Sequence, residues 1–308
     1  MRITFLLFDG FSNIVLGCLL EPLRAVRDAS DRPVEWAILT PDDAPVHSSS
    51  DLRISPTAPV DTVSGCDLLV AVAGYGFRSQ VDPPTLQLLH RLTRTAEQVV
   101  AADTAAWLVA AAGLLREQEA TIHWQVLAEF AETFPEVSVV PTRYVKQGRI
   151  WTCGGASTAL DLALSFIKDS FGPAVAFDAS SLFLHDAERQ RKFGRGPNHL
   201  QSRGSAKLHS LVNMMVDTIE APVPLDQLAA RANLSLRTLH RLFVKEIGMT
   251  PGRYYQLLRL SRARDLATST ELDLREIALR SGFADASSLG KAFKAAFGAS
   301  LSKTRFSR

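Results

Sequence analysis

The last hundred residues constrain the fold most strongly, because a helix-turn-helix pattern occurs in them twice. The first copy runs from Leu228 to Gly248, and the second runs from Ile277 to Gly298. In both copies, two stretches with apolar residues at helical spacing flank a short polar turn. The second helix of such a motif enters the major groove of DNA, so the duplication predicts two DNA-reading helices in an all-α C-terminal domain.

One helix is expected to join the two copies. Thr250 suits the N-cap of that helix, and Pro251 suits its first position, where the missing N–H costs nothing. Tyr254, Leu257 and Leu258 follow at a spacing that places them on one face. A rigid connector of this kind would hold the reading helices roughly 34 Å apart, which is one turn of the DNA duplex.

The segment from Leu208 to Phe297 resembles the DNA-binding domain of the AraC/XylS family. Besides the duplicated pattern, the resemblance rests on Arg259 and Ala263 in the joining helix and on the Gly282-Phe283 turn. It implies a transcriptional regulator that recognises a promoter sequence in double-stranded DNA.

The family's base-facing positions can be placed on this sequence one by one. They fall on Arg237, His240 and Arg241 in the first reading helix and on Ala286, Ser287, Gly290 and Lys291 in the second. Arginine makes the commonest specific contact, to guanine, whereas Ala, Ser and Gly offer only methyl contacts or weak hydrogen bonds. The first helix is therefore expected to supply most of the specificity. Lys245 is expected to contact phosphate, which is also the alternative role for Arg237, Arg241 and Lys291.

The two parts of the chain differ in charge. Residues 1–185 hold 13 Lys and Arg against 21 Asp and Glu, a net charge of −8, whereas residues 203–308 hold 17 against 9, a net charge of +8. The difference predicts that the C-terminal part meets the phosphate backbone. Residues 186–204 are basic and broken by Gly and Pro, as in a linker. We therefore predict a domain over 1–185, a linker over 186–204 and a DNA-binding domain over 205–308.

Several classes of protein are excluded by the sequence. No apolar run approaches the roughly 20 residues that a bilayer span needs, and no secretory leader is recognisable at the N-terminus. Cys18, Cys66 and Cys153 are too few and too scattered for a disulfide framework or a zinc site. We expect a cytoplasmic, nucleoid-associated bacterial protein with no metal, no cofactor and no membrane partner.

The N-terminal part has the pattern of an α/β doubly wound fold. Ile3–Phe8, Leu68–Ala73 and Val99–Ala102 are continuous apolar runs, which is typical of strands buried on both faces of a parallel sheet. Ile14–Ala29 and Pro84–Glu97 have amphipathic helical spacing. Ligands of such folds bind at the carboxyl ends of the strands.

Residues 3–170 resemble the class I glutamine-amidotransferase-like superfamily of the PfpI type, which implies a flavodoxin-like fold. The matching motifs are Phe8-Asp9-Gly10-Phe11, Glu21-Pro22-Leu23-Arg24, Asp103–Leu108, Ala112–Leu115, Ala120–Trp124 and Thr152–Gly155. Enzymes of this superfamily carry a cysteine on a strand-to-helix elbow, with a histidine and a glutamate beside it. Here the elbow position is Asp103, the histidine is His123 and the glutamate is Glu21.

A carboxylate at the elbow cannot form a thiolate, so we expect thiol catalysis to be lost, assign no catalytic residue and predict that the protein is not an enzyme. The resemblance leaves a concave site, and two carboxylates in one site favour a cationic ligand with an aromatic neighbour. The candidate ligand-binding residues are Glu21, Asp103, His123, Phe11, Trp107 and Trp124. Alternatively, Asp103 only caps its own helix, His123 is a core histidine, and the tryptophans only pack.

Such a domain joined to an AraC-type reader resembles bacterial regulators whose former enzyme domain senses metabolites and dimerises. Recognised members respond to amines and amino-acid-like metabolites such as betaines, carnitine or arginine. The sequence therefore predicts a homodimeric, ligand-responsive transcriptional regulator. Two alternatives remain: a thiol-independent hydrolase or amidotransferase-like enzyme with a DNA-binding tail, and a ligand-independent DNA-binding protein.

Overall fold

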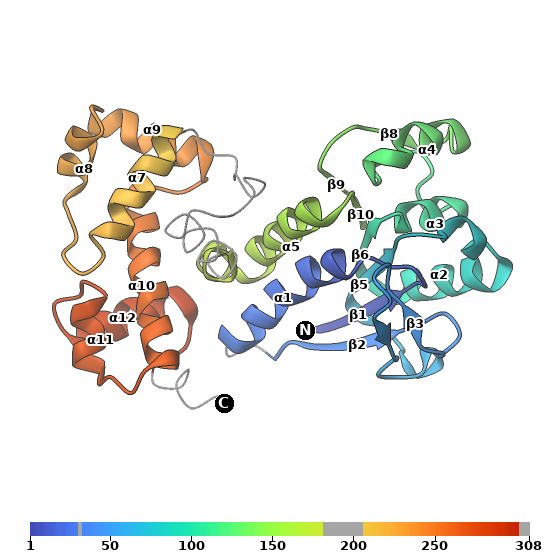
Figure 1. Ribbon diagram of the computed structural model, residues 1–308, viewed down its shortest axis with the longest axis horizontal. Helices are drawn as coiled ribbons and strands as arrows, with labels where there is room; N and C mark the ends of the chain where they lie inside the picture. The colour runs from blue at the N-terminus through green and yellow to red at the C-terminus, as the bar shows by residue number, and fades with distance from the viewer. Residues whose placement is uncertain (30–32, 181–205, 302–308) are drawn as a thin grey trace. The chain divides into compact units, whose positions relative to one another are not determined.

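The computed structural model describes residues 1–29, 33–180 and 206–301, which form two compact units (Figure 1). Of the described residues, the first unit holds 1–27 and 33–170, and the second holds 28–29, 171–180 and 206–301. Residues 171–180, which the sequence analysis assigned to the first domain, thus group with the second unit. The predicted linker over 186–204 lies outside the described residues.

The first unit is an α/β domain built around one main sheet. Its strands are β1 (Arg2–Leu7), β2 (Glu35–Leu39), β3 (Val46–His47), β4 (Arg53–Ile54), β5 (Cys66–Ala73), β6 (Ala96–Asp103), β7 (Glu119–Ala120), β8 (Ser138–Val139), β9 (Tyr144–Gln147) and β10 (Ile150–Cys153). Its helices are α1 (Asn13–Ala29), η1 (Val60–Thr62), η2 (Phe77–Gln80), α2 (Pro83–Thr95), α3 (Ala105–Ala111), η3 (Trp124–Val126), α4 (Leu127–Thr133) and α5 (Ala156–Phe171).

Among the described residues, six strands form the main sheet in the order β2-β1-β5-β6-β10-β9, and β9 is the antiparallel member. The other neighbours in this sheet are parallel. Figure 1 shows α1 and α5 on the opposite side of the sheet from α2 and α3. The predicted doubly wound, flavodoxin-like class is therefore confirmed, and the carboxyl ends of β1, β5, β6 and β10 meet at one edge of the sheet.

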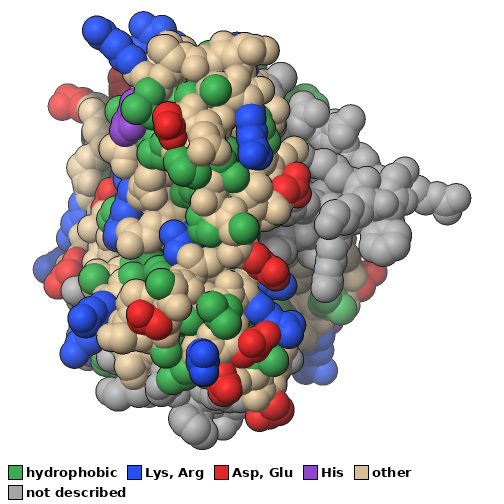
Figure 2. All heavy atoms as spheres, turned by 90° about the vertical axis from the view of Figure 1, so that its left-hand side faces the viewer, with side chains coloured by type: hydrophobic (Ala, Val, Ile, Leu, Met, Phe, Trp, Pro, Cys, Tyr) green, Lys and Arg blue, Asp and Glu red, His purple; other side chains and the backbone are tan. Residues whose placement is uncertain are grey.

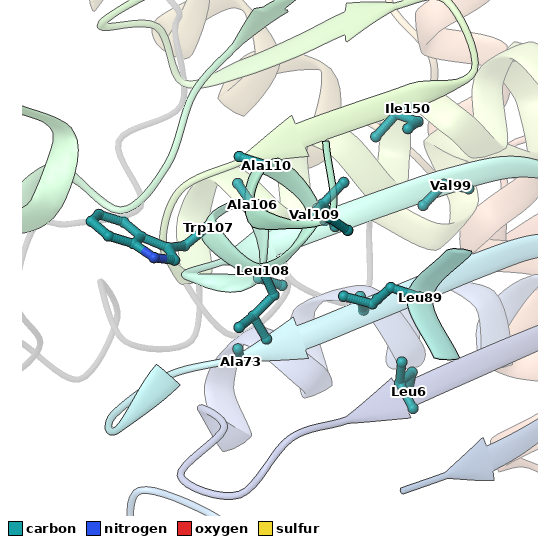
Figure 3. Close-up of a cluster of buried hydrophobic side chains, with 14 of the residues drawn as sticks. Leu6, Ala73, Leu89, Val99, Ala106, Trp107, Leu108, Val109, Ala110 and Ile150 are labelled. Carbon is teal, nitrogen blue, oxygen red and sulfur yellow. The ribbon is translucent and has the colours of Figure 1, made fainter. Parts of the chain in front are cut away.

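The core explains why the strands read as continuous apolar runs. All residues of β5 from Leu68 to Ala73 are buried, because helices cover both faces of the sheet. Leu69 and Ala71 face the side on which Leu89 of α2 and Leu108 of α3 pack. Figure 3 shows this cluster, with Trp107 at its margin.

The second unit is helical throughout its regular structure. Besides the helical residues 173–180, its elements are α7 (Ala206–Asp217), α8 (Leu225–Arg231), α9 (Leu236–Glu246), α10 (Pro251–Ser269), α11 (Leu274–Arg280) and α12 (Ala286–Phe297). Helices α8 and α9 form the first helix-turn-helix, and α11 and α12 form the second. The start of α10 is as predicted: the Thr250 side chain accepts a hydrogen bond from the N–H of Arg253, and Pro251 is the first helical residue.

Helix α10 binds the second helix-turn-helix through Arg259. Its guanidinium donates hydrogen bonds to the carbonyls of Ser281 (3.1 Å) and Gly282 (2.5 Å) and lies 4.2 Å from the Phe283 ring centroid. These carbonyls follow the end of α11, where a helix leaves its acceptors without partners. Gly282 has a φ of +74°, and a Cβ there would lie 2.2 Å from the carbonyl oxygen of Ile219, so no other residue fits.

No helix among the described residues combines the length and hydropathy that a bilayer span requires. On the face seen in Figure 2, basic, acidic and hydrophobic side chains are interspersed. The positive charge of the second part of the chain therefore does not form one continuous patch on that face.

Candidate functional site

The elbow at the end of β6 has an unusual backbone. Asp103 adopts a φ of +60°, in the left-handed region that non-glycine residues rarely occupy, and α3 begins two residues later. A strand that turns this sharply into a helix presents the elbow residue at the carboxyl edge of the sheet. The structure therefore retains the elbow geometry with a carboxylate in the place of a thiol.

Neighbouring loops hold this elbow in place. The Thr104 hydroxyl donates a hydrogen bond to the Gly74 carbonyl, at 2.9 Å, and thereby ties the elbow to the loop after β5. That loop in turn touches the loop after β1, because a Cβ at Gly74 would lie 2.2 Å from the Gly10 carbonyl oxygen. The loops after three adjacent strands are thus in contact beside Asp103.

On its other side the elbow meets the loop after β10, which brings His123 to the site. The Asp103 N–H donates to the Gly154 carbonyl at 3.1 Å. A Cβ at the next residue, Gly155, would lie 3.5 Å from Cδ2 of His123. Asp103 and His123 therefore flank the same two-glycine turn, as the family resemblance implied.

Burial shifts the pKa of both Asp103 and His123. Burial raises the pKa of Asp103 to about 7, and the Thr104 N–H partly offsets this by donating to the carboxylate. Thr104 is the N-cap residue of α3, and no side-chain hydrogen bond caps that helix; no Lys, Arg or His of the described residues forms an ion pair with Asp103. Burial also lowers the pKa of His123, and its Nδ1 accepts the Gln125 N–H at 3.4 Å. A neutral imidazole with Nδ1 as acceptor carries its proton on Nε2.

The cysteines cannot replace the missing elbow thiol. Cys153 is fully buried at the end of β10, and burial raises the pKa of its thiol to about 12. Burial likewise raises the pKa of Cys18 and Cys66. Each thiol is therefore protonated at neutral pH and a poor nucleophile. Within the described ranges, no group of three or more His, Cys, Asp and Glu could hold a metal ion.

The remaining predicted ligand residues are placed unevenly. Glu21, on α1, forms an ion pair with Arg24 at 2.6 Å and is partly exposed. Phe11 is fully buried, and Trp107 packs among the rings of Phe77, Phe130 and Phe134. Trp124 is different, because 74% of its surface is exposed and its ring lies 5.8 Å from that of His123. Trp124 is thus the predicted aromatic residue with a free ring face beside His123.

Sequence reasoning missed two features of this edge. Tyr75 follows Gly74 in the loop after β5 and is 75% exposed. Asn13, at the start of α1, donates hydrogen bonds to the hydroxyls of Ser48 (2.7 Å) and Ser50 (2.6 Å). An exposed tyrosine between two glycines was a usable signal, whereas the Asn13 cluster joins residues far apart in the sequence.

The predicted DNA-reading residues lie on the second helix of each motif. In α9, which begins after the N-cap Ser235, Arg237, Arg241 and Lys245 are exposed and His240 is partly exposed. Leu239 and Phe243 are buried on the opposite face. The helix therefore offers its basic face to solvent and its apolar face to the unit's core.

Helix α12 has the same arrangement with smaller side chains. Asp285 and Ser288 form a capping box at its start, and Gly298 ends it in a left-handed conformation. Ser287 and Lys291 are exposed, and Ala286 and Gly290 are partly exposed.

Val244 of α9, which the sequence analysis passed over, is 51% exposed one turn after Arg241. An apolar group there could meet a thymine methyl.

These features define a class of protein: an α/β domain with an elbow that lacks its thiol, joined to a duplicated helix-turn-helix. Comparison with known families agrees. Residues 1–169 match the model of the DJ-1/PfpI family, and residues 228–306 match a helix-turn-helix domain model. Similarity also extends over almost the whole chain to the HTH-type transcriptional regulator GbdR of Pseudomonas aeruginosa. The two are 32% identical over 299 residues, which cover 96% of this chain and 82% of the relative.

The chain therefore belongs to the AraC-type transcriptional regulators that carry an N-terminal DJ-1/PfpI domain. An AraC family transcriptional regulator from Pseudomonas putida has a similar fold in its crystal structure, with a TM-score of 0.54 and 20% identity. That similarity covers 59% of this chain and 98% of the other. An isonitrile hydratase from Pseudomonas putida is 27% identical over 175 residues, which cover 56% of this chain and 73% of the enzyme.

Proposed function

We propose that this chain regulates transcription by reading a promoter with α9 and α12, and that its first unit senses a small cationic metabolite. Two features support the reading role. The exposed faces of both second helices carry the predicted contact residues, and Arg259 fixes the second motif to α10. A fixed pair of reading helices suits two successive major grooves on one side of the duplex.

The observation that carries the sensing role is the state of Asp103. Its carboxyl group is buried at the carboxyl edge of the sheet, in a left-handed conformation, with a pKa of about 7. No cationic side chain of the described residues neutralises it. A bound cation would supply the missing charge and convert the carboxyl group to its ionised form.

The chemistry of the surrounding residues narrows the ligand to an amine or guanidinium with an apolar body. The neutral His123 offers Nε2–H as a hydrogen-bond donor, which suits a carboxylate on the same ligand. Trp124 offers an aromatic face, which favours a quaternary ammonium or guanidinium group. A betaine, carnitine or arginine-like amine meets these requirements. Glu21 remains a predicted contact, held by its ion pair with Arg24.

A thermal-shift screen of amines and amino acids against the full chain tests this proposal. A ligand at one hundred times its dissociation constant should stabilise the parent by about 2.7 kcal/mol. Asp103→Asn should lose this stabilisation, whereas Asp51→Asn should retain it. Asp51 is a fair control because it is exposed and has the same left-handed φ, +60°. If Asp103→Asn is stabilised as much as the parent, the ligand does not use this carboxylate.

Binding should also depend on pH. Below pH 7 the buried Asp103 is protonated in the free protein, so a cation must bind at the cost of losing that proton. The affinity for the amine should therefore rise about tenfold from pH 6 to pH 8. Asp103→Asn should bind equally weakly at both values. A parent affinity that is flat over this range would contradict the role of Asp103.

We propose that the elbow binds its ligand and does not transform it. The elbow position holds a carboxylate, and the thiol of Cys153 has a pKa of about 12, so neither group can act as the superfamily's thiolate. The similarity to an isonitrile hydratase makes isonitriles the most searching substrates, together with glutamine and glyoxals. Turnover that disappears in Asp103→Asn would establish an enzyme in place of a sensor.

Dimerisation is the remaining part of the proposal. One reading helix rich in arginine and one with small side chains make limited specific contact, so a second copy on a repeated site would raise the effective affinity. Sedimentation of the full chain at micromolar concentration should give twice the mass of one chain. A single-chain mass at every concentration, with and without DNA, would remove dimerisation from the account.

A further inference from the structure

Residues 173–180 are helical and belong to the DNA-binding unit, although they precede the predicted linker. Only Gly172 separates them from the end of α5. Phe177 and Asp178 of this segment are both buried. Phe177 contacts Tyr254 of α10 and Asp178 contacts Arg264 of α10, and the two contacts lead to different reading helices.

The first contact leads to α9. The Phe177 ring meets the Tyr254 ring edge-on, with centroids 5.0 Å apart and an angle of 86° between the planes. Tyr254 also contacts Phe243 of α9, with ring centroids 5.4 Å apart. Phe243 is fully buried and lies on the face of α9 opposite to Arg241. Phe177 therefore supports α9 through one intermediate ring.

The second contact leads to α12. The Asp178 carboxylate forms an ion pair with Nη1 of Arg264, and both side chains are about nine-tenths buried. The Arg264 guanidinium lies 4.2 Å from the ring centroid of Phe297 and 5.4 Å from that of Phe293, which are both buried residues of α12. The ion pair thus holds the guanidinium against the C-terminal end of α12, the second reading helix.

Asp178 is the acid that forms an ion pair with the buried Arg264, and the neighbouring Asp265 also raises the pKa of that guanidinium. Burial lowers the pKa of Arg264 to about 10, which leaves it charged at neutral pH. Its Nε and Nη2 have no hydrogen-bond partner among the described residues. A buried charge with so few hydrogen bonds depends on its counter-ion, so removing Asp178 should displace the guanidinium from the α12 rings.

We propose that Phe177 and Asp178 are positioning residues for DNA recognition, which fix the spacing of α9 and α12 through Tyr254 and Arg264. The inference rests on the proposed DNA-reading function. It assigns part of the reading apparatus to a segment that directly follows the sensor-type domain in the chain. A displacement of residues 173–180 that is transmitted through α5 would then change the spacing of α9 and α12.

The experiment uses the full chain and duplexes that the parent selects from a random pool. In the selected duplex, the half-sites are the two stretches of sequence that α9 and α12 read. Two variants of this duplex place the half-sites one base pair closer together or one base pair further apart. In a third variant, random sequence replaces one half-site. Fluorescence anisotropy measures the affinity of the parent, Asp178→Asn, Asp178→Glu and Phe177→Leu for each duplex. Asp169→Asn is the control, because its exposed ion pair with Lys146 lies in the first unit.

Asp178→Asn and Phe177→Leu should bind the two-half-site duplex about tenfold more weakly, lose the preference for one spacing, and bind the single half-site as the parent does. Asp178→Glu should restore most of the spacing preference, and Asp169→Asn should match the parent. An unchanged spacing preference in both Asp178→Asn and Phe177→Leu overturns the inference. So does an equal loss on single and double sites, which indicates general destabilisation. A parent that selects no duplex contradicts the proposed function itself.

Discussion

Among the described residues, the first unit buries the carboxyl group of Asp103, whereas the second unit buries Arg264 together with Asp178. In the second unit, Arg264 has its counter-ion in Asp178 and remains charged. In the first unit, Asp103 has no ion-pair partner among the described residues, and its pKa is raised to about 7. A charge that is completed inside the protein stabilises one arrangement. A buried carboxyl group that has no counter-ion within the protein can receive one from a cationic ligand.

The largest expected effect comes from breaking the completed pair. Asp178→Ala leaves Arg264 buried without its counter-ion, so the free energy of unfolding of the second unit should fall by about 3 to 5 kcal/mol. Urea denaturation of the full chain, followed by circular dichroism, measures this. Replacing both partners, Asp178→Leu with Arg264→Met, should recover most of the loss because no charge is then buried. A loss below about 1 kcal/mol in Asp178→Ala would mean that the pair is not formed in solution.

The next expected effect is a gain in the free energy of unfolding, and it concerns Asp103. The folded-state pKa of Asp103 is about 7 and the ordinary value is 3.8, so ionisation costs stability as the pH rises from 4 to 7. Asp103→Asn removes this cost without changing the shape. Its free energy of unfolding should exceed that of the parent by roughly 2 to 4 kcal/mol at pH 8 and should equal it near pH 4. Asp51→Asn should show no such pH-dependent gain, and a gain of the same size there would sink the assignment.

Local signals in the sequence predicted the parts of the fold that depend on neighbours along the chain. Thr250 and Pro251 mark the start of α10, and the apolar run of β5 was predicted within two residues of its bounds. The elbow was identified through the family resemblance, because an aspartate does not by itself indicate a left-handed backbone. The structure adds that Asp103 is buried and without an ion pair among the described residues.

Contacts between distant residues could not be predicted in this way. Asp178 and Arg264 are 86 positions apart, and nothing near either residue identifies its partner. A lone carboxylate in the apolar run from Ala174 to Ala179 was a signal of some buried contact, but not of which one. Trp107 is similar, because the phenylalanines that enclose it come from two other stretches of the chain. Its burial leaves Trp124 as the residue on which the aromatic part of the proposal rests.

The smallest expected effects concern the exposed basic residues of α9 and α12, whose substitution should change the affinity for DNA. Arg241→Ala should cost about 1 to 3 kcal/mol on the selected duplex and much less on random DNA, because a base contact is lost. Lys245→Ala should weaken both equally, as a phosphate contact does. Lys291→Ala, on α12, should cost less than Arg241→Ala on the selected duplex. Gel-shift titrations on both DNAs check this, and an equal loss for Arg241→Ala on both would make Arg241 a phosphate contact.

The most direct test of the whole account is the DNA affinity of the full chain with and without the amine that gives the largest thermal shift. Binding at Asp103 should change the parent's affinity for the selected duplex by about fivefold or more, in either direction. Asp103→Asn should bind that duplex within a few fold of the parent and should not respond to the amine. If Asp103→Asn responds to the amine as the parent does, the incomplete charge at the elbow is not the sensor.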